Sequence, residues 1–103
     1  MSAEHIEVDR LWQRARAVEQ GLDPELTRQA YERIVALDPL QPAAWLKLSQ
    51  LALLRGAYRD ARTSTLLAAD ATRHSRRWRA LPDVAMQLLH FDARVLVSGL
   101  IAC

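Results

Sequence analysis

A short basic and aromatic stretch offers the clearest opportunity for chemistry in this sequence. It contains His74, Trp78 and four arginines, which are Arg73, Arg76, Arg77 and Arg79. Guanidinium groups bind phosphates and carboxylates through paired hydrogen bonds, and an interleaved aromatic ring suits stacking on a base. The stretch is therefore a candidate patch for an anionic partner. A solvated helix end is the simpler explanation, because cations are favourable near a helix C-terminus, and the net charge of only +2 makes nucleic acid an unfavoured partner.

The histidines, serines and single cysteine show no catalytic or metal-binding arrangement. His5, His74 and His90 lie far apart, without cysteines or paired carboxylates at ligand spacing. The serines lie in no nucleophile elbow, and three glycines do not form a phosphate-binding loop. Cys103 alone permits neither an internal disulfide nor a thiolate metal cage. We expect no enzymatic activity, no metal and no cofactor.

Composition indicates one soluble folded domain. The 103 residues are 50% hydrophobic and 25% charged, with 3 glycines and 4 prolines. The N-terminal sequence lacks the apolar stretch of a signal peptide, and no run of about 18 apolar residues could span a membrane. We therefore expect a cytoplasmic protein without a membrane partner. Charge is uneven, since residues 1–38 hold eight acidic and five basic residues, whereas residues 39–103 hold four acidic and nine basic ones.

Apolar residues recur at helical spacing, and strand-like alternation is nearly absent, so the sequence predicts an all-α fold of about five to six helices. We expect helices over roughly residues 6–20, 24–37, 42–55 and from Tyr58 onward. Gly21 should stop the first helix, with Asp23 and Pro24 starting the second, and Gly56 should stop the third. The fourth has no clear breaker before the arginines. Pro82 should open a fifth helix, and a short sixth one should follow.

A 34-residue period organises these helices. Nine residues of segment 42–75 fall at characteristic positions: Trp45, Leu48, Ser49, Ala52, Gly56, Tyr58, Ala61, Thr65 and Ala68. The pattern resembles the tetratricopeptide repeat (TPR), with Ala52 and Thr65 in place of larger aromatic residues and Arg73 in place of a proline.

Segment 8–41 resembles a degenerate unit of the same kind. Its matches are Leu11, Ala15, Val18, Tyr31, Ile34 and the pair Asp38-Pro39. Segment 79–103 forms a partial repeat, or capping helices, if about three extra residues are allowed. The resemblance implies antiparallel helix pairs stacked as a TPR-like α-solenoid, with residues 1–103 as a single domain.

TPR proteins bind peptides in a concave groove lined by the first helix of each pair. Carried over by position, the lining is Trp12, Arg16, Leu46, Gln50, Leu53, Leu54, Met86 and Leu89, with Glu19 and His90 beside them. This mostly apolar lining lacks the Lys, Asn and Arg set with which chaperone-binding members hold a C-terminal carboxylate, so that activity is not implied. The resemblance implies a scaffold or adaptor for a protein or peptide partner. Alternatively, a neighbouring helix or a second subunit covers Leu46, Leu53 and Leu54.

The C-terminal sequence is apolar and carries no charge after Arg94. Stacked repeats need a polar cap, and none is evident, so we expect a homodimer or packing on a further repeat. Val97, Leu100 and Ile101 are the candidate self-association residues. One alternative is that the chain is the N-terminal scaffold of a longer enzyme, such as a transferase, with catalysis outside these residues. Another is a nucleic-acid adaptor using the arginines, whose affinity would fall steeply with salt.

Overall fold

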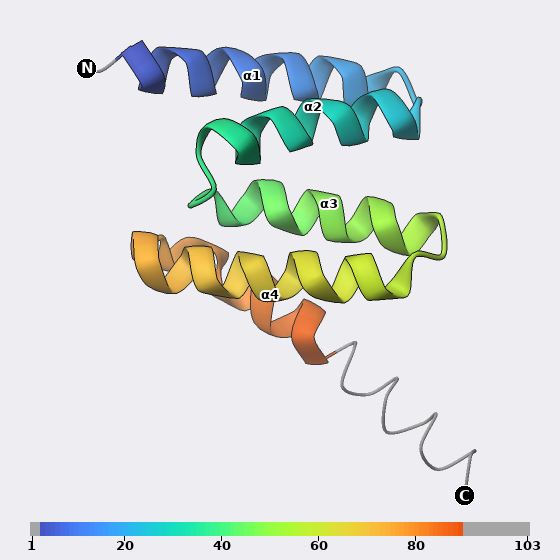
Figure 1. Cartoon of the computed structure of the whole chain (residues 1–103), viewed down its shortest axis with the longest axis vertical. Helices are drawn as coiled ribbons and strands as arrows, with labels where there is room; N and C mark the ends of the chain where they lie inside the picture. Colours follow the sequence, from blue (N-terminus) through green and yellow to red (C-terminus); the bar gives the residue numbers. More distant parts are fainter. Residues whose placement is uncertain (1–2, 90–103) are drawn as a thin grey trace, which may run out of the picture.

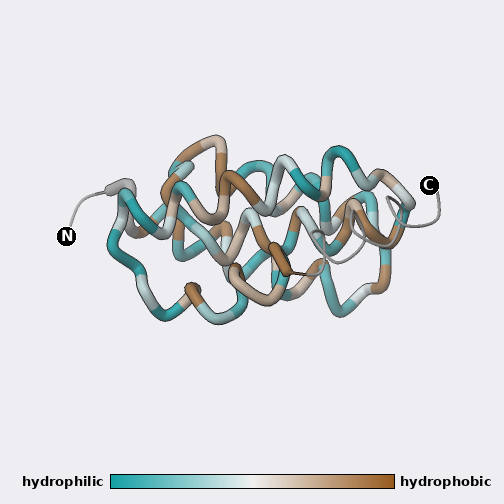
Figure 2. Tube along the Cα trace, turned by 90° about the horizontal axis from the view of Figure 1, so that it is seen from below, coloured by the Kyte–Doolittle hydropathy of each residue, from teal (hydrophilic) through white to brown (hydrophobic). Residues whose placement is uncertain are grey.

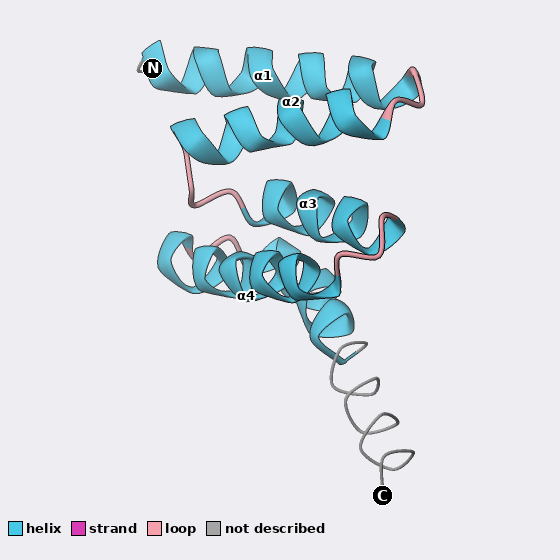
Figure 3. Cartoon of the chain, turned by 45° about the vertical axis from the view of Figure 1, so that its right-hand side comes forward, coloured by secondary structure: helices cyan, strands magenta, loops and turns pink. Residues whose placement is uncertain are grey.

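The computed structural model describes residues 3–89, and this part of the chain is helical without any strand. The helices are α1 (Ala3–Gln20), α2 (Pro24–Leu37), α3 (Pro42–Leu54) and α4 (Tyr58–Ser75), followed by the short 3₁₀ helix η1 (Trp78–Ala80). Residues 81–89 are again helical. Figure 3 shows these helices joined by short loops. The all-α prediction is confirmed for the described residues.

Local sequence sets most helix boundaries. The Asp23 carboxylate accepts hydrogen bonds from the amides of Glu25 and Leu26, and Pro24 occupies the first turn of α2. This side-chain cap satisfies amides that have no partner within the helix. Pro42 begins α3, and Gly56 follows it with a φ of +77°, which glycine adopts without steric cost. These boundaries agree with those predicted from the sequence.

Two boundaries depend on non-glycine residues in the left-handed conformation. The sequence suggested that Gly21 would stop α1, but Leu22 has the positive φ, of 62°. The Gly21 amide donates to the carbonyl oxygen of Val18 at 3.0 Å and thus closes the last turn of α1. Arg76 similarly ends α4 with a φ of 57°. Neither residue type signals a left-handed stop, which explains why the end of α4 was unclear in the sequence.

The helices run in alternating directions, and each packs on the next one along the chain (Figure 1). The central helix α3 packs on both α2 and α4. Its buried residues are Pro42, Ala44, Leu46, Leu48, Ser49 and Ala52. They point in several directions around the helix, as expected for a helix with apolar residues on nearly every side. Figure 2 shows hydrophobic and hydrophilic positions alternating along the helices.

Apolar clusters hold successive helices together. One joins α1, α2 and α3 through Ala15, Tyr31, Ile34, Ala44 and Leu48. A second joins α3, α4 and residues 81–89 through Leu46, Ala68 and Val84. The ring of Trp45 packs against both clusters, and its indole nitrogen donates to the Pro39 carbonyl oxygen at 2.8 Å. Trp45 thus packs at the junction between the two helix pairs.

The two helix pairs are related by a period of 34 residues. Gln20 and Leu54, which end α1 and α3, are 34 positions apart, and so are Pro24 and Tyr58, which begin α2 and α4. Burial follows the same period in four pairs of buried residues: Ala15 and Ser49, Thr27 and Ala61, Tyr31 and Thr65, and Ile34 and Ala68. Equivalent positions in the two pairs are therefore buried alike.

A buried hydroxyl network occupies the α3–α4 interface where the first pair has Tyr31. The hydroxyl oxygens of Ser49 and Thr65 lie 2.6 Å apart, and they lie 3.0 and 2.8 Å from the Ala61 carbonyl oxygen, which accepts hydrogen bonds. The side-chain amide of Gln87 donates to the Ser49 oxygen at 3.3 Å. Within the described residues every buried side-chain polar atom has a partner, so this interface avoids the cost of unsatisfied hydroxyls.

The conformation of Leu22 leads to a stability prediction. Its side chain is 88% exposed, so burial contributes little there, whereas the left-handed backbone is unfavourable for a residue with a Cβ. We expect Leu22→Gly to raise the free energy of unfolding by about 0.5 to 1 kcal/mol, measured by urea denaturation. Leu66→Gly, inside α4, is the matched control and should lower it by about 1 kcal/mol. A loss of stability in Leu22→Gly would contradict the assignment.

Candidate binding groove and arginine pocket

One face of the molecule is formed by α1, α3 and residues 81–89. The Lys47 ammonium on α3 lies 3.0 Å from the Glu19 carboxylate on α1. Further along this face lies an open pocket of about 390 Å³, within the size range of ligand sites. We call this pocket the groove. Its lining comes from α3 and residues 81–89: Ala43, Leu46, Lys47, Gln50, Asp83, Met86 and Gln87. Three of the predicted groove residues, Leu46, Gln50 and Met86, are brought together here.

Two predicted groove residues on α1 make contacts with each other instead of lining that pocket. The rings of Trp12 and Tyr31 meet edge to face, with centroids 5.6 Å apart. The guanidinium carbon of Arg16 lies 5.7 Å from the centre of the Trp12 ring. Trp12, Arg16 and Glu19 lie on one side of α1 by helical spacing. They therefore extend the face formed by α3, but separately from the pocket.

The remaining predicted groove residues lie outside the pocket. Leu53 is partly buried and packs against the cluster of Ala52 and Ala61. Leu54 is 81% exposed at the end of α3, and Leu89 is exposed too. Leu46 is buried, so only its edge contributes to the pocket. His90 and the self-association candidates Val97, Leu100 and Ile101 lie outside the described residues.

The sequence did not single out several residues that shape this face. Lys47, Asp83 and Gln87 line the pocket. Asp83 lies three positions before Met86, and Gln87 lies one position after it. This spacing places all three side chains toward one side of the helix. Their alignment with α3 requires the register of residues 76–80, which the repeat pattern left open by about three residues.

A chain of polar contacts ties three helices together at this face. The buried Tyr31 hydroxyl on α2 donates to Glu19 at 3.0 Å, and Lys47 donates to the other oxygen of the same carboxylate. Partial burial opposes ionisation of Glu19, but the hydrogen bonds from Lys47 and Tyr31 outweigh it and lower the pKa of the carboxyl. Burial, together with the hydrogen bond to Glu19, raises the pKa of Tyr31 to about 12.

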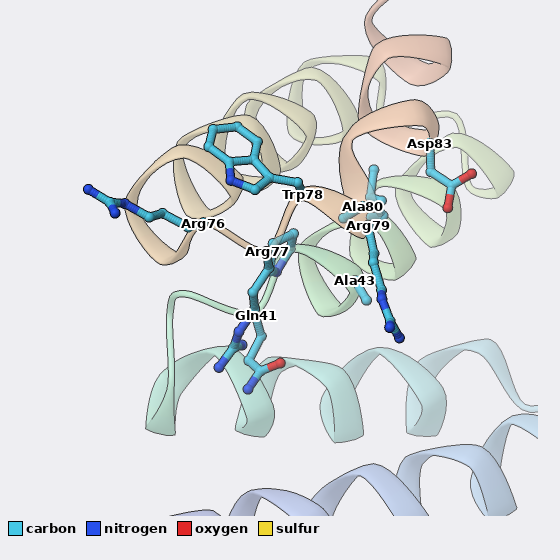
Figure 4. A pocket seen from close by; sticks show the side chains of 10 residues that line it. Gln41, Ala43, Arg76, Arg77, Trp78, Arg79, Ala80 and Asp83 are labelled. Carbon is cyan, nitrogen blue, oxygen red and sulfur yellow. The ribbon is translucent and has the colours of Figure 1, made fainter.

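A second pocket, of about 680 Å³, lies where the turn after α4 meets the start of α3, and we call it the arginine pocket. Figure 4 shows its lining, which comprises Gln41, Pro42, Ala43, Leu46, Arg76, Arg77, Trp78, Arg79, Ala80 and Asp83. Three of the four arginines of the predicted anionic patch are thus gathered at one cavity. The fourth, Arg73, does not line it and instead forms an ion pair with Asp70 on α4.

Arg77 fixes the turn to the loop between α2 and α3. Its guanidinium donates to the carbonyl oxygen of Leu40 at 2.9 Å and lies 3.8 Å from the Asp38 carboxylate. Asp38 itself accepts hydrogen bonds from the Leu40 amide and the Gln41 side chain. Arg77 therefore has a structural role, whereas Arg76 and Arg79 make no ion pair with any described residue.

The opposite face presents a further groove, of about 540 Å³, between α2 and α4. Charges around it compensate one another: Arg28 pairs with Glu25 and Glu32, and Arg55 pairs with Asp60 at 3.3 Å. These surface pairs leave little uncompensated charge to attract a partner.

Neither a metal cluster nor a membrane-spanning helix occurs in residues 3–89. No group of three or more His, Cys, Asp or Glu side chains is placed to hold a metal ion there. No helix in the same range is both long and apolar enough to cross a bilayer.

No protein-family model, curated protein or solved structure matches this chain. Its function must therefore be inferred from the chemistry of these helices and of their two adjoining pockets.

The raised pKa of Tyr31 gives a pH prediction. Because the folded-state pKa, about 12, lies above the ordinary value of 10.0, stability from the neutral phenol is complete below pH 10 and is lost as pH rises toward 12. We expect the free energy of unfolding in urea to fall more steeply over this range in the wild type than in Tyr31→Phe. The absorbance step at 295 nm near pH 12 should disappear in the variant. Identical slopes would show that Tyr31 is not linked to alkaline unfolding.

Proposed function

We propose that this chain is a TPR-like helical-repeat module that binds a peptide or short helix of a protein partner on the α1–α3 face. Three features support the proposal: the antiparallel order of the helices, the 34-residue spacing between the turns within the two pairs, and the recurrence of burial at that spacing. Stacked helix pairs of this kind create extended surfaces suited to elongated ligands.

The observation that carries the proposal is the pocket between α3 and residues 81–89. Met86 is 69% exposed and lies beside Ala43 and the edge of Leu46, which gives the pocket an apolar component. Methionine adapts its shape to different apolar side chains, which suits a peptide site. The pocket therefore offers an uncovered apolar contact at a defined position on the repeat face.

Polar groups in the same pocket suit the backbone of a bound peptide. The side chains of Gln50 and Gln87 both donate and accept hydrogen bonds, as peptide groups do. The neighbouring charge of Lys47 is compensated by Glu19. A ligand with apolar side chains and a hydrogen-bonding backbone matches this lining, in the manner of helix-in-groove recognition.

The proposal is tested by selecting short peptides from a random displayed library with the full chain. The best binder is then measured by fluorescence polarisation. We expect Met86→Lys to weaken binding about tenfold, because it places a charge in the apolar contact. Leu54→Lys is the matched control, since Leu54 is exposed on the same face-forming helix but outside the pocket.

In an NMR titration with the same peptide, the amide chemical-shift changes should centre on Gln50, Met86 and Gln87. Shift changes confined to α2 and α4, or equal weakening by both lysine variants, would show that the peptide binds elsewhere. Selection that yields no binding peptide would overturn the proposed function.

Self-association is a second part of the proposal and rests on the apolar sequence Val95 to Cys103. Light scattering over a dilution series should give twice the chain mass of 11.7 kDa. Leu100→Asp or Ile101→Asp should give the monomer mass or unfold the chain, because a charge in an apolar contact is costly. Leu22→Asp, at an exposed turn, should leave the mass unchanged. A wild-type chain that is monomeric at every concentration would contradict this part.

A further inference from the structure

The pocket beside the α4–η1 turn has a chemical character unlike that of the rest of the surface. Three arginines, Trp78, which is 53% exposed, and one acidic residue, Asp83, are among the residues that line it. The positive end of the α3 dipole lies at the same place, since Pro42 begins that helix. Positive charge here therefore exceeds negative charge.

The arginines of the pocket differ in what they are free to do. Arg77 is already engaged by Leu40 and Asp38. Arg79 has no ion-pair or hydrogen-bond partner among the described residues, and its side chain lines the cavity. In Figure 4, Arg77 and Arg79 extend toward the side of the turn where Gln41 and Ala43 lie, whereas Arg76 extends away. Arg79 is thus the guanidinium best placed to bind a ligand inside the pocket.

This pocket adjoins the groove, since Ala43, Leu46 and Asp83 line both cavities. A peptide that occupies both would follow a path from Arg79 along α3 to Gln50 and Met86. The path begins at a cationic, aromatic end and continues over apolar and amide groups.

We propose that the arginine pocket binds a Glu or Asp side chain of the peptide whose apolar residues occupy the groove. This inference rests on the proposed function and specifies its partner as a peptide with an acidic residue next to an apolar segment. Arg79 would hold the carboxylate by two parallel hydrogen bonds, the arrangement that a guanidinium forms best. Arg77, held by Leu40 and Asp38, positions the turn from which Arg79 extends.

An acidic peptide fits these observations better than a nucleic acid does. A nucleic-acid strand carries a phosphate at every nucleotide and needs cations along its whole path. Beyond the arginines, the groove supplies only Lys47, which Glu19 neutralises, and Asp83 would repel a second phosphate. A single carboxylate followed by apolar groups matches the observed order of side chains.

The test uses the full chain, the random-peptide selection described above and two charge-neutralising variants. Arg79→Gln removes a charge from the pocket. Arg73→Gln removes an equal charge from the same basic stretch but outside the pocket, so it is the matched control. Each is measured with the best selected peptide, with that peptide's Glu→Gln or Asp→Asn counterpart, and with a single-stranded oligothymidine.

We expect the selected peptides to be enriched in an acidic residue beside apolar ones. Arg79→Gln should weaken the acidic peptide about tenfold, and Arg73→Gln less than about twofold. The neutral counterpart should bind about tenfold more weakly and show no further loss with Arg79→Gln, because the two groups form one interaction. The indole N–H resonance of Trp78, assigned with Trp78→Phe, should shift on binding.

Other results would overturn the inference in distinguishable ways. Peptides without acidic enrichment, bound in the groove and insensitive to Arg79→Gln, would overturn it while leaving the proposed function in place. Equal weakening by the two arginine variants would indicate general charge attraction. Oligothymidine that displaces the peptide and binds more tightly, with an Arg79 dependence, would assign the pocket to nucleic acid. If no peptide binds, both the inference and the proposed function are wrong.

Discussion

The packing of α3 between α2 and α4 is the interaction on which both pockets depend. Each helix packs on the next one along the chain, so the position of a helix depends on the interface that precedes it. Here α3 supplies Ala43 and Leu46 to both pockets, while Leu48 joins the cluster with α1 and α2. A change in how α3 sits would therefore displace the groove and the arginine pocket together.

The α3–α4 interface uses polar groups where the α1–α2 interface uses an aromatic ring. Tyr31 fills the first interface, and at the equivalent position Thr65 forms hydrogen bonds with Ser49 and the Ala61 carbonyl. Threonine is smaller than tyrosine, which permits α3 and α4 to approach closely over Ala61 and Ala68. Directional hydrogen bonds then fix the register that side-chain bulk fixes in the first pair. Gln87 joins this network, so residues 81–89 are aligned by it too.

Sequence reasoning succeeded where a residue type has one dominant local effect. Asp23 with Pro24, Pro42 and Gly56 each specify a helix boundary, and all are found as predicted. The left-handed residues Leu22 and Arg76 were missed because neither residue type favours that conformation, so the local sequence gives no signal for it.

The candidate site was predictable in part, for a related reason. Resemblance to the TPR pattern predicts Leu46, Gln50 and Met86 as lining residues from their positions in the repeat. It does not fix how two helices are aligned, which depends here on the turn of residues 76–80. That is why Leu54 and Leu89 lie outside the pocket, while Asp83 and Gln87 lie within it. Proximity of Arg79 to the groove likewise arises from the tertiary fold.

The contact between Arg77 and the Leu40 carbonyl also has a mechanical meaning. It joins positions 37 residues apart and crosses the joint between the second helix pair and the loop before it. Stacked helix pairs can bend relative to one another at the loops that join them. A hydrogen bond across such a loop opposes that bending. The turn after α4 is thus tied to the loop that precedes α3. The stiffness of the groove is in this way separated from the residues that would touch a ligand.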